Sequence, residues 1–452
     1  METSFTTQQL ADPEIKEAAT LLKDCVHYGF CTAVCPTWVL SRDENDGPRG
    51  RIDLIRDMLE RGGVPAAKTV KHIDTCLSCN SCMTTCAAKV DYMHLADRAR
   101  IHIERHYARP TADRLLRALI ATILPRPPLF KLALGAAALV NPFRRILPGR
   151  LRGLIAMARS ARAPVEGGLH PARYPAEGEV RLRVALLDGC AQQVLAPHIT
   201  AATIRLLARH GCEVTLVKGA VCCGALTLHM GKEAAAKKSA RQTITAWWEL
   251  KSQGKLDAIV VNASGCGTTI KDYGHLFQFE PEIRDRAREI STITYDVTEM
   301  MDRLGLRAIS APTGQQVAYH DACSLQHAQK ITTQPRGLLR RAGYQVFDVP
   351  ERHFCCGSAG TYNMLQPEIA AQLGERKARN IESTGASIVA AGNLGCITQL
   401  ATFTNLPIIH TVELLDWATG GPRPVWFEEL GARDRVSGEN SMSVESELKG
   451  IW

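Results

Sequence analysis

Four cysteines at short, regular intervals form the strongest chemical pattern in this 452-residue sequence. They lie in the run Cys76-Leu-Ser-Cys79-Asn-Ser-Cys82-Met-Thr-Thr-Cys86, a Cys-x2-Cys-x2-Cys-x3-Cys spacing. A loop with two residues between thiolates can direct three sulfur atoms at three corners of one cubane [4Fe–4S] cluster. Zinc sites use paired Cys-x2-Cys units separated by a longer insert, so zinc or a chance pattern is the weaker interpretation.

A second run, closer to the start of the sequence, repeats this pattern with one change. It reads Cys25-Val-His-Tyr28-Gly-Phe-Cys31-Thr-Ala-Val-Cys35-Pro36. The spacing is that of bacterial two-cluster ferredoxins, but Tyr28 stands where the second cysteine is expected. The two tandem runs therefore predict two Fe–S sites, one of which lacks a thiolate.

In such tandem runs the fourth cysteine of each copy reaches the cluster of the other copy, so the ligands cross over. The complete [4Fe–4S] site is expected to consist of Cys76, Cys79, Cys82 and Cys35. The incomplete site is expected to consist of Cys25, Cys31 and Cys86, with Tyr28 at the missing position.

Three interpretations of the incomplete site remain open. A [3Fe–4S] cluster needs only three thiolates, and we favour it. A [4Fe–4S] cluster would need the Tyr28 phenolate or a water molecule on its fourth iron. In the third interpretation, the site has been lost or removed.

The number and placement of the cysteines indicate reduced thiolates. The sequence has 16 cysteines, nearly all in short clusters, and residues 1–19 are polar and charged, with no apolar centre of a signal peptide. Thiols in such a chain serve metal or redox chemistry more often than disulfides. We therefore expect a cytoplasmic protein, or one on the cytoplasmic face of the inner membrane.

From residue 184 the sequence changes to short apolar runs that alternate with helix-like stretches. The runs are 184–187, 214–217, 258–261, 317–319, 345–347 and 387–390. Strands that alternate with helices predict parallel α/β units.

This half of the sequence also contains an internal repeat of cysteines. The first copy has Cys190, the pair Cys222-Cys223 followed by glycine, and Cys266. The second has Cys323, the pair Cys355-Cys356 followed by glycine, and Cys396. In both copies 31 residues separate the lone cysteine from the pair. Each cysteine follows a predicted strand or lies in a glycine-marked turn, and the strand ends of α/β units converge on one face.

The eight repeat cysteines are candidate metal ligands. They could hold a further Fe–S cluster, zinc, or nothing stable, in which case they would be small buried hydrophobes. Five histidines lie near these motifs: His229, His320, His327, His353 and His410. Each is more often a core or surface residue than a ligand. His320, beside Asp321 and near Cys323, is the one most worth testing.

A basic segment separates the two halves. Between Arg114 and Arg162 there are ten Lys/Arg and no Asp/Glu. Prolines divide it into short helices, and its longest uncharged run, 132–143, is too short to cross a membrane. It fits either a membrane surface or an acidic partner, or an ordinary linker with solvated arginines. No recognition fold accompanies the charge, so we expect no nucleic-acid partner.

These patterns predict an α+β multidomain fold. We expect an α-helical ferredoxin-type domain with two Fe–S sites (1–108), a basic amphipathic linker (109–180), a first Cys-Cys-Gly domain (181–310), a second (311–425) and a flexible tail (426–452). No Gly-x-Gly-x-x-Gly follows a strand, so no flavin or nicotinamide site is expected on this chain, and no catalytic residue is assigned.

The layout resembles that of the iron–sulfur subunits of glycolate oxidase (glycolate dehydrogenase) over about residues 20–420. Local matches include Cys35-Pro36, Asp46-Gly-Pro-Arg-Gly-Arg51 and the Cys76–Cys86 run with Val90-Asp-Tyr92. Related subunits occur in lactate-utilisation complexes, anaerobic glycerol-3-phosphate dehydrogenase and heterodisulfide reductase.

The resemblance implies an electron-transfer subunit without catalysis of its own. A separate FAD subunit would oxidise glycolate, and electrons would pass through the Fe–S clusters towards membrane quinone. The Cys-Cys-Gly repeats resemble those that carry unusual [4Fe–4S] clusters in heterodisulfide reductase, where a fifth cysteine follows. Here Thr269 and Gln399 occupy those positions, so an ordinary four-thiolate site or zinc stays open. A heterodisulfide-reductase-like catalytic subunit and a zinc-bearing scaffold are the competing classes.

Overall fold

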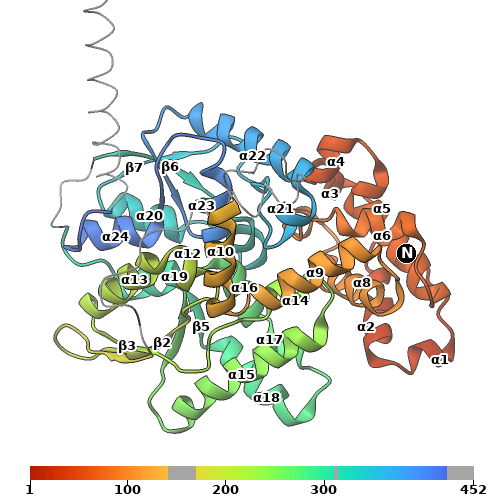
Figure 1. The fold of residues 1–452 in the computed structure, drawn as a ribbon, viewed down its shortest axis with the longest axis horizontal. Coiled ribbons are helices and arrows are strands. Elements are labelled where there is room, and N and C mark those ends of the chain that lie inside the picture. Colours follow the sequence, from red (N-terminus) through yellow and green to blue (C-terminus); the bar gives the residue numbers. More distant parts are fainter. Residues whose placement is uncertain (141–168, 170, 310–313, 425–452) are drawn as a thin grey trace, which may run out of the picture.

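The computed structural model describes residues 1–140, 169, 171–309 and 314–424. Figure 1 shows a helical module, coloured red to orange, beside two α/β units coloured from yellow-green to blue. The fold class predicted from the sequence, a helical module followed by two repeated α/β units, is confirmed. Residues 141–168 of the predicted linker and the predicted tail, 426–452, lie outside the described residues.

Short helices around an apolar core make up the N-terminal module. They are α1 Thr7–Leu10, α2 Pro13–Lys23, α3 Phe30–Ala33, α4 Pro36–Ser41, η1 Glu44–Asp46, α5 Pro48–Arg61, α6 Ala67–Asp74, α7 Ser81–Thr85 and α8 Tyr92–His106. Proline begins α2, α4 and α5, where its missing N–H costs no hydrogen bond. Ile52, Ile55 and Leu59 recur on one face of α5 and are buried, as are Leu22 and Leu95 on the helices packed against it.

The first α/β unit is built on a five-stranded sheet in the order β1-β3-β2-β4-β5. All neighbouring strands are parallel except β1 and β3. The strands are β1 Arg173–Tyr174, β2 Leu182–Leu186, β3 Cys212–Leu216, β4 Ala258–Val261 and β5 Thr294–Asp296. The helices are α12 Gln192–Leu195, α13 Pro197–Arg209, α14 Ala225–Leu228, α15 Glu233–Ser252, α16 Ser264–Lys271, α17 Tyr273–Leu276, α18 Pro281–Thr292 and α19 Val297–Leu304.

The second α/β unit has a four-stranded parallel sheet in the order β7-β6-β8-β9. Its strands are β6 Gln316–His320, β7 Gln345–Asp348, β8 Ile388–Ala391 and β9 Ile408–His410. Its helices are η3 Ser324–Ala328, α20 Gln334–Arg341, α21 Tyr362–Leu365, α22 Pro367–Glu382, α23 Leu394–Leu400 and α24 Thr411–Ala418. The order β7-β6-β8 repeats β3-β2-β4 of the first unit, so the repeat in the sequence is a repeat in topology.

Six of the nine strands coincide with the apolar runs that the sequence predicts as strands. All four residues of β4 and of β8 are buried, as expected of parallel strands covered on both faces. The prediction missed β1, β5 and β9, which have two or three residues each and at most two apolar residues in a row.

Two helices of the basic segment pack against the folded units. They are α9 Thr111–Ile123 and α10 Pro127–Val140. Ile120, Leu124 and Phe130 are buried in the core cluster that spans both α/β units. Arg117 is buried and bonded to Asp74 at 3.0 Å, so it is not one of the solvated arginines expected of a plain linker.

The helical module is docked on the first α/β unit through α8. Ile101 packs with Leu228 and Ala236, while Lys232 forms an ion pair with Glu104. At Gly231 the two backbones meet, and a Cβ at this position would lie 2.3 Å from the carbonyl oxygen of Arg100. Only glycine allows this approach, and its φ of +79° also lies in the left-handed region.

Gly231→Ala is therefore expected to loosen this docking. The left-handed backbone costs about 1 kcal/mol in any L-residue, and overpacking against Arg100 adds about 1–3 kcal/mol. Gly254→Ala is the control, because Gly254 has a φ of +65° and a Cβ added to it would meet no other atom within 4 Å. Urea unfolding of the anaerobically purified protein should show the larger loss for Gly231→Ala. Equal losses for both variants would contradict a tight seam at Gly231.

Candidate functional site

The structure brings the four cysteines of the predicted complete site around one small cavity. They are Cys35, Cys76, Cys79 and Cys82. All four are buried, with exposed fractions of 9% or less. Cys35 comes from the first run, where it precedes α4, so one cysteine of the first run shares this cavity with three of the second.

The three cysteines of the predicted incomplete site line a separate cavity. Cys25, Cys31 and Cys86 share it with Tyr28 and Arg49. Tyr28 is 66% exposed, whereas Cys25 is buried. The structure therefore places the three thiols at one cavity and Tyr28 at the solvent side of that cavity.

The two cysteine loops follow the same backbone path. Ser78 and Asn80 have φ values of 50° and 59°, and the corresponding His27 and Gly29 have 58° and 84°. Left-handed residues on both sides of the second ligand position let each loop curl around its cavity. The loop at Tyr28 thus has the same backbone form as the loop at Cys79, although Tyr28 has no sulfur atom at the second ligand position.

Two buried arginines surround the complete site. Arg51 donates a hydrogen bond to Cys35 Sγ at 3.9 Å, and Arg100 donates to the carbonyl oxygen of Cys76 at 2.7 Å. Burial raises the pKa of Cys76, but the positive charges of Arg51 and Arg100 outweigh it, so the pKa lies below its ordinary value. The cysteine spacing gives no sign of these arginines, although Arg51 ends the run 46–51 on which the family resemblance rests.

The cysteines of each repeat lie at the carboxyl ends of three adjacent parallel strands. Cys190 follows β2, the pair Cys222-Cys223 follows β3, and Cys266 lies on α16 after β4. In the second repeat Cys323 follows β6, the pair Cys355-Cys356 follows β7, and Cys396 lies on α23 after β8. Three loops thus bring four sulfur atoms to the same edge of each sheet, as the α/β pattern predicts.

The backbone geometry requires glycine after each cysteine pair. Gly224 and Gly357 both have a φ of +88°. A Cβ would lie 2.8 Å from the carbonyl oxygen of Ala236 at Gly224, and 2.5 Å from that of Ala370 at Gly357. The glycine therefore lets the cysteine pair sit directly against the second helix after it, α15 in the first repeat and α22 in the second.

One cavity connects the two repeats. All eight repeat cysteines line it together with Cys76, and its volume is about 230 Å³. The two units meet at this edge, where Ser264 and Ser324 are hydrogen-bonded at 2.7 Å. Phe130 of α10 also lines the cavity. The repeats thus share one cavity between the units.

The second repeat adjoins the complete N-terminal site. Cys79 and Cys355 belong to one buried apolar cluster, against which Cys323 packs. Tyr362 donates a hydrogen bond to the carbonyl oxygen of Thr75 at 2.9 Å across the same seam. Sulfur donors of the helical module and of the second repeat are therefore neighbours with no solvent layer between them.

In the first repeat, the thiols pair with one another. Cys190 is hydrogen-bonded to Cys222, which lowers the pKa of Cys222 to about 7. The hydrogen bond with Cys266, followed by burial, raises the pKa of Cys223. Tyr273 donates to the carbonyl oxygen of Cys223 at 2.9 Å and fixes the loop.

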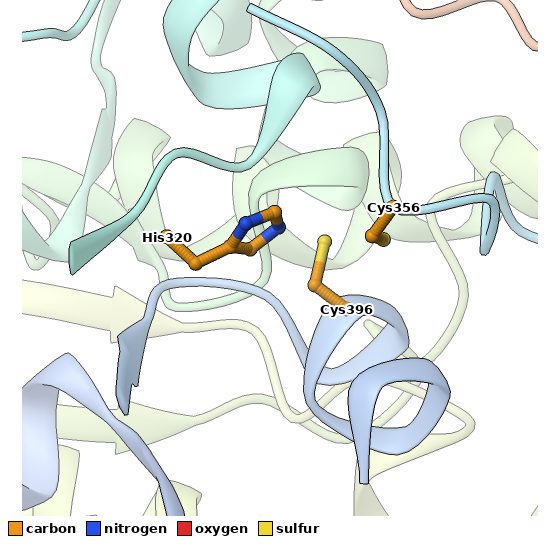
Figure 2. A group of neighbouring side chains, drawn as sticks. All are labelled: His320, Cys356 and Cys396. Carbon is orange, nitrogen blue, oxygen red and sulfur yellow. The ribbon is translucent and has the colours of Figure 1, made fainter. Parts of the chain in front are cut away.

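A histidine accompanies the thiols of the second repeat. A ring nitrogen of His320 and the sulfur atoms of Cys356 and Cys396 all lie within 4.8 Å of one another (Figure 2). The Cys323 thiol donates a hydrogen bond to Cys355 Sγ, with 3.8 Å between the sulfur atoms. Burial and the nearby ammonium of Lys377 lower the pKa of His320 to about 3, so its imidazole is neutral at physiological pH.

The other histidines singled out in the sequence have different surroundings. His327 is within 2.8 Å of the Thr84 hydroxyl, and His410 contacts the carbonyl oxygen of Asn262 at 2.8 Å. His229 lies 3.5 Å from Asp97 of α8, and His353 stacks edge-on with Phe354. None of these four belongs to a cluster of metal-ligating side chains with the repeat cysteines among the described residues.

The positions at which related repeats have a fifth cysteine are occupied by hydrogen-bonded side chains. Thr269 donates to the carbonyl oxygen of Gly265 at 3.4 Å. Gln399 donates to the carbonyl oxygen of Ala370 at 3.0 Å and accepts from Asn363 at 3.0 Å. Both side chains thus hydrogen-bond to backbone carbonyl oxygens.

The donor sets fit iron–sulfur clusters. Burial excludes water from most of the thiols, and cationic side chains stand beside them at the complete site and at the second repeat. Among the described residues, no helix combines the length and apolar character needed to cross a membrane.

Comparison with known families agrees with this geometry. Residues 24–91 match the 4Fe-4S dicluster domain, and residues 184–271 and 317–401 each match the cysteine-rich domain. These matches contain all fifteen residues discussed above as cysteine donors, and the 4Fe-4S dicluster match covers the seven cysteines of the two N-terminal sites.

Similar proteins extend over most of the sequence. The chain is 37% identical to the glycolate oxidase iron-sulfur subunit of Escherichia coli K12, over 92% of this chain and 99% of that protein. It is 28% identical to the probable glycolate oxidase iron-sulfur subunit of Bacillus subtilis 168, over 84% and 88%. Lactate utilization protein A of the same organism is 28% identical over 52% of this chain and 99% of its own length. The chain therefore belongs to the family of glycolate oxidase iron–sulfur subunits.

Proposed function

We propose that this chain is the electron-transfer subunit of a flavin-dependent 2-hydroxy-acid (glycolate) dehydrogenase complex. It would receive electrons from a separate FAD subunit and deliver them towards membrane quinone. The observation that carries the proposal is the unbroken series of cysteine groups, from the Tyr28 cavity at the surface to the cavity shared by the repeats.

Neighbouring groups of this series from the Tyr28 cavity to the second repeat share apolar clusters. Cys25 and Cys82 belong to one apolar cluster, against which Cys31 and Cys86 pack. Cys79 in turn packs with Cys355 of the second repeat. Such close neighbours give electrons a short route that avoids solvent.

The cysteines would hold the cofactors as follows. Cys35, Cys76, Cys79 and Cys82 would bind a [4Fe–4S] cluster, and Cys25, Cys31 and Cys86 a [3Fe–4S] cluster. The repeat cysteines would bind further Fe–S clusters or zinc. Iron–sulfur clusters supply one-electron chemistry, which matches the stepwise oxidation of a two-electron flavin.

The protein's own side chains would set the potentials. Arg51 and Arg100 place positive charge beside the complete site, and Tyr92 donates a hydrogen bond to Cys76 Sγ at 3.6 Å. Charge and hydrogen bonds at the sulfur atoms favour the reduced, more negative state of a bound cluster. The complete site is thereby suited to accept electrons.

A second candidate function rests on the shared cavity. Its 230 Å³ between two sets of four cysteines gives room for a small acceptor. A heterodisulfide-reductase-like chain would reduce a substrate there. In the favoured function the cavity holds only the cofactors of the repeats.

The functional proposal predicts a defined complex. Anaerobic purification of the tagged chain from its native host should recover an FAD subunit, and the complex should reduce a dye or quinone on addition of glycolate. Lactate and glycerol 3-phosphate are the comparison donors. A brown, iron-loaded chain that accepts electrons from no flavoprotein would contradict the proposal.

Substitutions of Tyr28 distinguish the interpretations of the incomplete site. With a [3Fe–4S] cluster, the oxidised wild type should give a three-iron paramagnetic resonance signal. Tyr28→Cys should convert it to a cubane, adding one iron per chain and removing that signal. Tyr28→Phe is the control and should leave signal and iron content unchanged. A change in Tyr28→Phe would instead indicate a phenolate ligand.

The outer surface of α9 and α10 supports a peripheral membrane location. Leu115, Leu119 and Leu132 are 63%, 51% and 71% exposed, and Arg114 and Lys131 are exposed beside them. Apolar side chains with a cationic fringe match an anionic lipid surface. This surface would hold the complex near quinone on the cytoplasmic face of the inner membrane.

The triple variant Leu115→Ser, Leu119→Ser, Leu132→Ser tests that location. Each leucine contributes about 1.5 kcal/mol or more when buried in lipid, so binding to phosphatidylglycerol vesicles should fall more than tenfold in a sedimentation assay. Val64→Ser with Val180→Ser, at exposed sites elsewhere, is the control. Unchanged binding of the triple variant would contradict a membrane role for this surface.

A further inference from the structure

His320 is a buried polar side chain with no hydrogen-bond partner. Its exposed fraction is 1%, and neither Nδ1 nor Nε2 bonds to any group of the described residues. Buried polar groups are almost always paired, so an orphaned imidazole calls for a partner that is not part of the polypeptide.

The surroundings of His320 indicate which partner it is. The ring points towards the sulfur atoms of Cys356 and Cys396, within 4.8 Å of both (Figure 2). One imidazole nitrogen and two thiolates at such spacing form three corners of a site for a borderline metal ion such as iron or zinc. Asn393 donates a hydrogen bond to Cys396 Sγ at 3.5 Å, which orients that ligand.

The two repeats differ at this position. His320 is the last residue of β6, three residues before Cys323, and the corresponding residue of the first repeat is Leu187, three before Cys190. Leu187 is buried and apolar and offers no ligand atom. At the fifth-cysteine position of the second repeat, Gln399 is already engaged in hydrogen bonds.

We propose that His320 is a nitrogen ligand of the metal centre in the second repeat, alongside the thiolates of Cys356 and Cys396. The centre is an iron–sulfur cluster or a zinc ion, and either accepts a neutral imidazole. The two repeats are then chemically different, with thiolates alone in the first and mixed nitrogen and sulfur in the second. The inference rests on the proposed presence of metal in the repeats.

In an iron–sulfur cluster, this ligand has a functional consequence. Replacing thiolate by neutral histidine removes negative charge and raises the reduction potential, as in clusters with two histidine ligands. The second repeat would then be the more oxidising of the two and the preferred electron acceptor from the adjacent complete site.

The test compares the wild type, labelled with ¹⁵N-histidine and purified anaerobically, with the variants His320→Leu and Cys356→Ala. If the centre is iron, the labelled wild type should show a nitrogen strongly coupled to the reduced cluster in pulsed paramagnetic resonance. If it is zinc, X-ray absorption should show nitrogen at about 2.0–2.1 Å besides sulfur at about 2.3 Å. Analysis of iron, sulfide and zinc distinguishes the two.

His320→Leu copies the residue of the first repeat and should lose that nitrogen signature together with part or all of one metal centre. His210→Leu is the matched control. His210 is equally buried, but Nδ1 contacts the carbonyl oxygen of Leu206 at 2.7 Å and Nε2 accepts from the backbone N–H of Arg307 at 3.0 Å. This variant should keep the full metal content and the signature.

The results distinguish a failure of the His320 ligand from a failure of the proposed metal binding by the repeats. If Cys356→Ala loses metal but the wild type shows only sulfur ligands, His320 is not a ligand and the inference is overturned. If Cys356→Ala loses no metal, the second repeat holds none, and the metal assignment of the proposed function falls together with the inference. The measurement on labelled wild type does not depend on the folding of any variant.

Discussion

Burial of sulfur donors is the constraint on which this structure depends. A thiolate withdrawn from water is costly unless a cation or a metal compensates its charge. The chain buries most of its cysteines in groups, and it places Arg51 and Arg100 beside one group and Lys377 beside another. The helical module and both α/β units are arranged so that these groups meet in the interior.

The repeats meet this constraint through topology. Parallel strands end at a common edge, and the middle strands of the two sheets have the same order. A lone cysteine, a cysteine pair and a helix-borne cysteine therefore reach one point from three loops. Gly224 and Gly357 bring the pair against α15 and α22, which no residue with a Cβ would permit.

The cysteine groups and most of the strands could be predicted from the sequence, because they depend on local spacing and apolar runs. The cross-over of Cys35 follows from the tandem pattern, and the strand ends follow from the α/β alternation. Features that depend on distant contacts could not be predicted. Examples are the ion pair of Arg117 with Asp74, the place of Phe130 at the shared cavity, and the short strand β9. Proximity to Cys323 marked His320, but its missing hydrogen-bond partners are visible only in three dimensions.

The seam between Cys79 and Cys355 has a consequence for how such proteins can change during evolution. The separation of these two sulfur donors is set by the docking of two units and not by the fold of either one. Neither unit can be exchanged for a distant homologue without altering the gap that an electron must cross. A substitution in one docking surface must be matched by one in the other to keep the distance between the sulfur atoms. The two surfaces therefore evolve together, although each unit has its own cysteine pattern.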